Sequence, residues 1–345
     1  AGRDDHYRQC GPHRVRTRQE LSPLLRAGRM FSALSQALRR LRTVGPQALC
    51  NAVCGAAEGI LRRPVPRSLP TSLDIILTKA CNLRCIFCIS YDSLDKVYWM
   101  DFDVYKRVAN ELFPSTLGIF LCSGGEPLLY PHLREALLLA KRHRTRATMT
   151  SNGMLLHEGV AAWMVADKGL QELCILFDGA RAQTLERIRR SADYQRILGN
   201  IDQLSRLKTD TKAAYPRLWF RFVLMRSNIE ELPEMVDLCR RHGLSKIEAK
   251  YLVVSNDIPF AESLHNHPQL TREVFAATKA RARGRHPTLP AASAGQPAFR
   301  AQMLHAPAVR PDRHRRLHPH LLLLLETAPR PRPGHFRHHL AWPAL

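Results

Sequence analysis

The sequence predicts an α/β protein in which six strands, each followed by a helix, form an open, partial version of the eight-unit (β/α) barrel. Short apolar runs alternate with longer segments of helical spacing along the middle of the chain. Such alternation is typical of βαβ units and a parallel sheet. In folds of this kind the chemistry lies on loops at the carboxyl ends of the strands, which is where every motif described below is found.

The predicted strands are short apolar runs that end in turn residues. The second run ends at Ser123-Gly124-Gly125, the third at Asn152-Gly153 and the fourth at Asp178-Gly179, and these residue types favour turns. The six predicted strands cover residues 72–78, 117–122, 147–151, 172–177, 218–225 and 246–254.

The predicted helices are bounded by recognisable start and stop signals. Asp101 is a candidate N-cap, Pro131 suits a first turn, and Gly169 and Gly243 follow the ends of two helices. The predicted helices cover residues 102–113, 131–143, 157–168, 184–208 (as one helix or two), 230–242 and 270–283.

The two ends of the chain differ from the middle. In residues 286–345, 46 of the 60 residues are Pro, Arg, His, Ala or Leu, and the apolar residues follow neither a helical nor a strand period. We expect an N-terminal extension at 1–66, a core domain at 67–285 and a low-complexity basic tail at 286–345. We further expect disordered or misread terminal extensions: residues 1–29 untranslated in nature, and the tail a frameshifted reading. The alternative is a genuine, disordered basic tail.

The net charge of +22 is concentrated at the two ends of the chain. Residues 1–66 carry 12 basic and 4 acidic residues, residues 286–345 carry 8 and 2, and the long middle carries 32 and 24. A basic RNA-binding protein is one class that such charge suggests, but the middle is only mildly basic, so we do not expect nucleic acid as a partner. The sequence contains no apolar run of 18 residues, so we expect no membrane span. No signal peptide is evident either, and we therefore expect a cytoplasmic protein.

Three of the nine cysteines lie close together after the first predicted strand. Cys81, Cys85 and Cys88 have the spacing C-x3-C-x2-C. Thiolates are the usual ligands of iron–sulfur clusters, and four irons ordinarily take four cysteines. A four-iron cluster bound by only three cysteines would have one iron free to bind another ligand. A zinc site is an alternative, although no histidine lies within the loop, and a chance grouping of inert thiols is another.

This loop resembles the signature of the radical S-adenosylmethionine (SAM) superfamily, C-x3-C-x-aromatic-C, with Phe87 at the aromatic position. The resemblance covers about residues 67–285 and is nearest to core domains of the SPASM and molybdenum-cofactor-synthesis groups. It implies a partial (β/α)6 TIM-like barrel, a [4Fe–4S] cluster on the three cysteines, and S-adenosyl-L-methionine on the open iron. One-electron cleavage of SAM then gives a 5′-deoxyadenosyl radical that abstracts hydrogen from a substrate; such chemistry belongs to the cofactor, while the protein binds and orients it.

Further motifs match the family in the same order along the chain. Residues 123–127 resemble its GGE motif, and residues 150–153 resemble the end of its third strand. Residues 176–180 resemble an S-L-D-G-A segment, with Leu176 in place of the serine, and Asn228 resembles a polar position past the fifth strand. An N-cap role for Asp178 and simple turn chemistry for the other motifs are the alternatives. The resemblance implies these cofactor contacts: Phe87, Gly124, Gly125, Glu126, Pro127, Ser151, Asn152, Asp178 and Arg221.

The resemblance implies an enzyme that acts on a peptide or small-molecule substrate and takes electrons from a donor such as flavodoxin or ferredoxin. The alternatives are a non-catalytic iron–sulfur or electron-transfer protein and an inactive, truncated member of the superfamily. A pocket for SAM distinguishes the enzyme from the electron-transfer protein, because electron transfer alone needs none.

Overall fold

The computed structural model describes residues 44–88, 98–121, 124–253 and 260–284, together with the backbone of two further strands, Arg300–Met303 and Leu321–Leu323. All of these lie in one compact unit, Val44–Leu345. The expectations for residues 1–29 concern a part of the chain outside the described residues, and those for 286–345 remain predictions.

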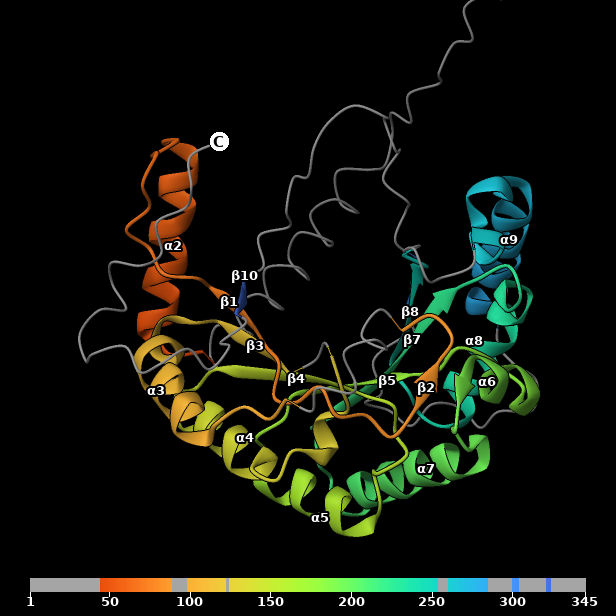
Figure 1. The fold of residues 1–345 in the computed structure, drawn as a ribbon, viewed down its shortest axis with the longest axis horizontal. Coiled ribbons are helices and arrows are strands. Elements are labelled where there is room, and N and C mark those ends of the chain that lie inside the picture. The colour runs from red at the N-terminus through yellow and green to blue at the C-terminus, as the bar shows by residue number, and fades with distance from the viewer. Residues whose placement is uncertain are drawn as a thin grey trace, which may run out of the picture. The chain divides into compact units, whose positions relative to one another are not determined.

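A parallel sheet forms the centre of this unit (Figure 1). Its six central strands lie side by side in chain order, β1-β3-β4-β5-β7-β8, and every neighbouring pair is parallel. The six strands predicted from the sequence and their parallel arrangement are thereby confirmed. Two short strands that the sequence did not predict, β9 and β10, pair with β8 and β1. The strand bounds are β1 Ser72–Ile75, β3 Gly118–Leu121, β4 Arg146–Ser151, β5 Glu172–Leu176, β7 Arg217–Leu224, β8 Lys246–Tyr251, β9 Arg300–Met303 and β10 Leu321–Leu323.

Helices lie along the outer face of this curved sheet (Figure 1). Asp101 caps α3 as predicted, since its carboxylate accepts hydrogen bonds from the backbone N–H groups of Asp103 and Val104. The helix bounds are α2 Pro46–Ile60, α3 Phe102–Leu112, α4 Leu133–Arg142, α5 Glu158–Asp167, α6 Ala182–Ile188, α7 Tyr194–Asp210, α8 Leu232–Arg241 and α9 Pro268–Arg283.

The segment predicted as one or two helices at 184–208 is two helices separated by a short strand. After α6 the backbone leaves helical geometry at Arg189, and Ser191 takes a positive φ of 73°. Between the helices lies β6, Arg189–Arg190, which pairs antiparallel with β2, Arg84–Cys85. Asp193 then caps α7 through the backbone N–H of Arg196 at 2.9 Å. This small ladder brings α6 and the cysteine loop together.

The compact unit begins upstream of the boundary that the sequence suggested at residue 67. Helix α2 packs against the short 3-10 helix Phe113–Ser115. The side chain of Gln47 donates to Ser115 Oγ at 3.0 Å, and that of Asn51 donates to the Ser115 carbonyl at 2.9 Å. Part of the predicted N-terminal extension therefore belongs to the folded unit.

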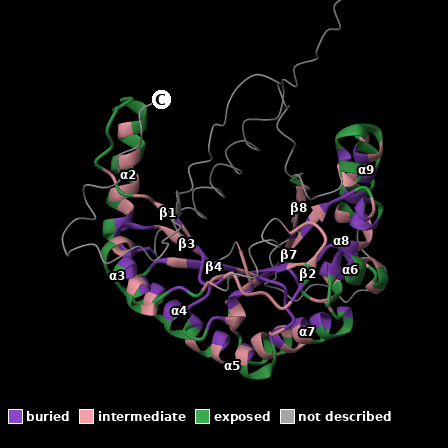
Figure 2. Cartoon of the chain, viewed as in Figure 1, coloured by how far each residue is buried: buried purple, intermediate pink, exposed green. Residues whose placement is uncertain are grey.

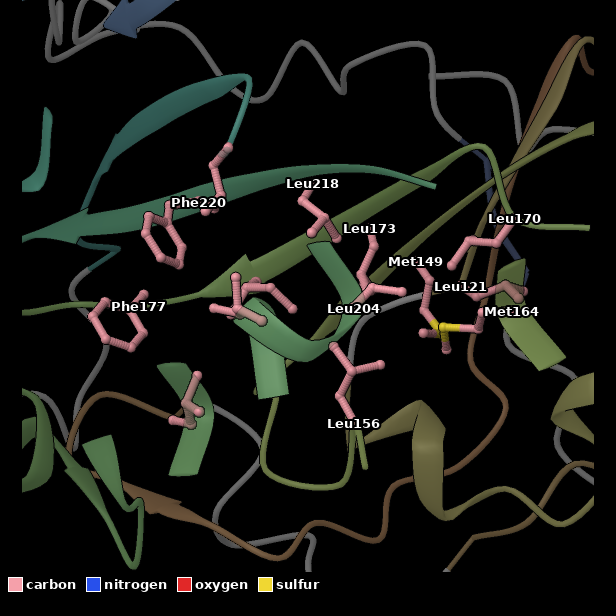
Figure 3. Close-up of a cluster of buried hydrophobic side chains, with 14 of the residues drawn as sticks. Leu121, Met149, Leu156, Met164, Leu170, Leu173, Phe177, Leu204, Leu218 and Phe220 are labelled. Atoms are coloured by element: carbon pink, nitrogen blue, oxygen red, sulfur yellow. The ribbon is translucent and has the colours of Figure 1, made fainter. Parts of the chain in front are cut away.

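The core lies between the sheet and its outer helices (Figure 2). Buried residues line the strands, while exposed residues lie mainly on the far sides of the helices. Figure 3 shows Leu173, Leu218 and Phe220 on neighbouring strands beside Leu204 of α7. Phe220 is fully buried and stacks on Phe177 at 4.8 Å between ring centroids. In the part of the chain that the structure describes, no helix is long and apolar enough to cross a membrane.

Phe220→Ala is expected to lower the free energy of unfolding by about 3–5 kcal/mol, because it removes buried ring contacts and leaves a cavity. Chemical denaturation of the purified chain measures this. Phe260→Ala is the matched control, since that side chain is 58% exposed and its loss is expected to change the value by less than about 0.5 kcal/mol. Equal losses in the two variants would contradict the placement of Phe220.

Candidate radical SAM site

The cysteine loop follows β1 and is held by the β2–β6 ladder. Cys85 lies opposite Arg189 in that ladder, and the N–H of Ile86 donates to the Ile188 carbonyl at 2.9 Å. The N–H of Cys88 donates to the carbonyl of Cys85 at 3.2 Å. Cys81, Cys85 and Cys88 are free and partly exposed. The loop therefore presents three partly exposed cysteines on a backbone that the ladder holds in place.

The surroundings of these thiols favour the protonated form when no metal is bound. Burial raises the pKa of Cys81, and it raises that of Cys85 to about 11. Within the described ranges, no three His, Cys, Asp or Glu residues form a group that could hold a metal ion directly. In a [4Fe–4S] cluster each thiolate binds a different iron, so the ligands of a cluster surround a body larger than one ion.

Two glycines let the loop after β3 lie directly against the cysteine loop. Gly124 has a φ of 116°, which side chains disfavour. A Cβ on Gly125 would overlap the carbonyl of Ala80 and lie 2.7 Å from the carbonyl of Thr78. This close approach allows the N–H of Glu126 to donate to the Ala80 carbonyl at 2.8 Å. Cys122 and Ser123, which precede the glycines, lie outside the described residues.

The Glu126 carboxylate joins the ends of β3 and β4. It is 2% exposed and accepts from the Ser151 hydroxyl at 2.8 Å, from the Asn152 N–H at 2.7 Å and from the Leu128 N–H at 3.1 Å. Burial raises the pKa of Glu126, and these hydrogen bonds oppose the rise. Pro127, itself buried, begins the 3-10 turn Pro127–Leu129 that supplies the Leu128 N–H.

The Asn152 side chain extends the same network to the cysteine loop. Its Nδ2 donates to Asn82 Oδ1 at 2.8 Å, and its Oδ1 accepts from the N–H of Met154 at 3.0 Å. Ser151 Oγ accepts from the N–H of Gly153 at 3.0 Å. The polar residues that the sequence singled out after β3 and at the end of β4 thus bind one another, which gives Glu126, Ser151 and Asn152 a scaffolding role beside their predicted contacts with a cofactor.

Asp178 has a role different from the helix N-cap considered above. The N-terminal cap position of α6 is Arg181. The fully buried Asp178 carboxylate accepts from the Val223 N–H at 2.7 Å through Oδ1, and its Oδ2 lies 2.6 Å from Nη2 of Arg189. Burial raises the pKa of Asp178, while the Arg189 guanidinium opposes that rise. Asp178 is thereby committed to an ion pair within the protein.

The sequence reasoning missed Arg189. Its guanidinium is almost fully buried, lies 5.4 Å from the centre of the Phe87 ring, and places Nη1 3.5 Å from Cys85 Sγ. An arginine in a segment of helical spacing gives no signal of burial, because arginine is common on exposed helix faces. The sequence contains no signal for the pair, because the burial of Asp178, which makes its carboxylate require a partner, is evident only in the structure.

The remaining predicted positions lie on or beyond β7. Arg221 Nη2 pairs with Glu248 Oε2 on β8 at 2.9 Å, and its guanidinium lies 5.2 Å from the Trp219 ring centre. The Asn228 side chain donates to the carbonyls of Asp178 and Val223. Asn228 therefore closes the turn after β7, and Arg221 joins two strands.

Comparison with known proteins indicates the class of this domain. Residues 75–239 match the model of the Radical SAM superfamily, so this part of the chain is similar to members of that superfamily. Mycofactocin maturase MftC of Mycolicibacterium smegmatis is 26% identical over 191 residues, which are 52% of this chain and 47% of that protein. A GTP 3′,8-cyclase of Chlorobaculum tepidum is 27% identical over 176 residues, which are 50% of each chain. In these comparisons the chain spans about half the length of its relatives.

A solved structure shares the fold. SuiB of Streptococcus suis, crystallised with the precursor peptide SuiA, superimposes with a TM-score of 0.55 over 71% of this chain and 51% of that one. The identity is 14%, so the likeness shows the fold alone. The resemblance read from the sequence and the predicted partial barrel are both confirmed.

Gly125→Ala is expected to destabilise the chain by about 1–3 kcal/mol, because the added Cβ overlaps backbone atoms that cannot move independently. The control is Gly199→Ala in α7, where nothing lies within 4 Å of the added Cβ and the change is expected to stabilise by up to about 1 kcal/mol. Denaturant unfolding measures both. A neutral Gly125→Ala would show that the two loops do not lie in contact.

In the cluster-free protein, alkylation of Cys85 by iodoacetamide is expected to accelerate about tenfold per pH unit and still be rising near pH 9.5. The cause is that only the thiolate reacts, and its pKa is about 11. Mass spectrometry of the labelled peptide gives the rate. A cysteine in a short unstructured peptide, with a pKa of about 8.5, should level off earlier, and the same plateau for Cys85 would contradict its burial.

Proposed function

We propose that this chain is a radical SAM enzyme. In this function Cys81, Cys85 and Cys88 would hold a [4Fe–4S] cluster, which would supply the electron for reductive cleavage of SAM to a 5′-deoxyadenosyl radical. This radical would abstract hydrogen from a peptide or small-molecule substrate. The observation that carries the proposal is the polar network through Glu126 and Asn152, which ties the three-cysteine loop to the ends of β3 and β4.

The donor set fits a cluster with one open iron. The three thiols are accessible, whereas Cys174 and Cys239 are fully buried in the core. The Nε–H of Arg189, also buried, has no acceptor among the described residues. An unpaired buried cationic donor is costly on its own and suits a neighbouring anion, such as a thiolate-ligated cluster.

The protein groups around the loop have distinct roles in the proposed site. Gly124 and Gly125 allow the loop after β3 to lie directly against the residues that precede Cys81, which brings Glu126 next to the cysteine loop. Among the described residues, Glu126 Oε2 accepts one hydrogen bond, from the Asn152 N–H. A carboxylate oxygen has two lone pairs, so Oε2 retains capacity for an ammonium group. Phe87 covers the guanidinium of Arg189 and shields it from water.

The proposed substrate is either a peptide or a small molecule. One relative is named for GTP, and SuiB was crystallised with a precursor peptide. We therefore include both a peptide and a small molecule, with flavodoxin or ferredoxin as the electron donor.

Cys85→Ala is expected to abolish the cluster absorbance and the formation of 5′-deoxyadenosine together, because it removes one of three iron ligands. The measurement is anaerobic reconstitution with iron and sulfide, followed by reduction with SAM and chromatography of the products. Cys50→Ala is the matched control, since Cys50 is exposed on α2 and its loss should leave both readouts unchanged. Normal iron content in Cys85→Ala would refute the assignment of Cys85 as an iron ligand. A reconstituted wild-type chain that holds the cluster but never cleaves SAM would refute the proposal that the chain is a radical SAM enzyme.

A further inference from the structure

One ion pair of the site is buried at a depth where charges are rarely found. The side chains of Asp178 and Arg189 are 0% and 3% exposed, and Oδ2 lies 2.6 Å from Nη2. Burying such a pair brings little net stability, because the loss of hydration offsets the attraction between the charges. Stability alone therefore does not account for the pair, and its surroundings indicate a second role.

The Asp178 carboxylate is fixed from the side of β7. Its Oδ1 accepts from the Val223 N–H at 2.7 Å, and the backbone carbonyl of Asp178 accepts from Asn228 Nδ2 at 3.0 Å. A carboxylate held in this way fixes the guanidinium that it binds. The arginine side chain cannot rotate away without leaving a buried carboxylate unpaired, which is costly.

The fixed guanidinium is directed at one particular cysteine. Residue 189 lies opposite Cys85 in the β2–β6 ladder, and Nη1 of Arg189 donates to Cys85 Sγ at 3.5 Å. The guanidinium also lies over the Phe87 ring, 5.4 Å from its centre. At Cys81, by contrast, the donor is the backbone N–H of Leu83 at 3.5 Å. Among the described residues, Arg189 is the cationic side chain that donates a hydrogen bond to one of the three cysteines of the loop.

We propose that Arg189 is a positioning residue that sets the reduction potential of the cluster through Cys85. Hydrogen bonds to cluster sulfurs and nearby positive charge favour the reduced state, which carries one more negative charge. The step is the uptake of one electron from the donor protein by the oxidised cluster, with no bond made or broken. The arginine makes this uptake more favourable by its charge and by the bond to Cys85 Sγ. The inference rests on the cluster of the proposed function and not on the substrate.

The test is a redox titration of the reconstituted full-length chain without SAM, followed by electron paramagnetic resonance of the reduced cluster. Arg189→Met is expected to hold about tenfold less reduced cluster at a fixed potential, which is the size of one hydrogen bond to a charged group and equals about 59 mV for a one-electron couple. Arg189→Lys, which keeps the charge but loses the planar fork, is expected to show a smaller shift in the same direction. Iron content is measured for each variant.

Arg190→Met is the matched control. It removes the same charge from the adjacent residue of β6, where the side chain is exposed, and it should leave the potential unchanged. An iron-replete Arg189→Met with the wild-type potential, or an equal shift in Arg190→Met, overturns the proposal. If Arg189→Met cannot hold iron, Arg189→Lys decides: a wild-type potential in that variant also overturns it. If the reconstituted wild-type chain does not cleave SAM at all, that result refutes the proposed function and not the role of Arg189.

Discussion

The site depends on one buried carboxylate. Glu126 is removed from water and therefore needs donors from its surroundings, and it obtains them from the loop after β4 and from its own turn. Its backbone N–H in turn binds the cysteine loop at Ala80. The ends of β1, β3 and β4 are thus held together by one side chain and its main chain. The glycine before it is required, because any larger residue would separate the two loops.

Most of the fold could be predicted from the sequence because the signals are local. Strands such as β5 are short apolar runs, and capping residues such as Asp101 mark where helices begin. The β2–β6 ladder could not be predicted, since two residues on each side give no period and the pairing joins segments far apart in the chain. Helix α2 was missed although Pro46 suits its first turn, because the helix follows a basic stretch, has no side-chain cap and keeps much of its surface exposed.

The positions of the site were easier to predict than their partners. Spacing singled out Cys81, Cys85 and Cys88, and the resemblance to the GGE motif singled out Glu126. Neither signal indicated that the Ser151 hydroxyl binds Glu126 or that Asp178 pairs with Arg189, because contacts between distant loops follow from the register of the sheet. The sequence identifies residue types that could bind a cofactor, whereas the fold determines which of them form hydrogen bonds or ion pairs with one another.

The β2–β6 ladder also bears on the order of events during translation. The six central strands lie side by side in the order of their synthesis, so each finds its neighbour already made as it leaves the ribosome. Arg189, however, follows Cys85 by 104 residues. A nascent chain that has emerged only as far as Cys88 holds the three thiols of the loop without the strand β6 that supports them. The support of the cysteine loop is complete only after Arg189 and Arg190 have also been made.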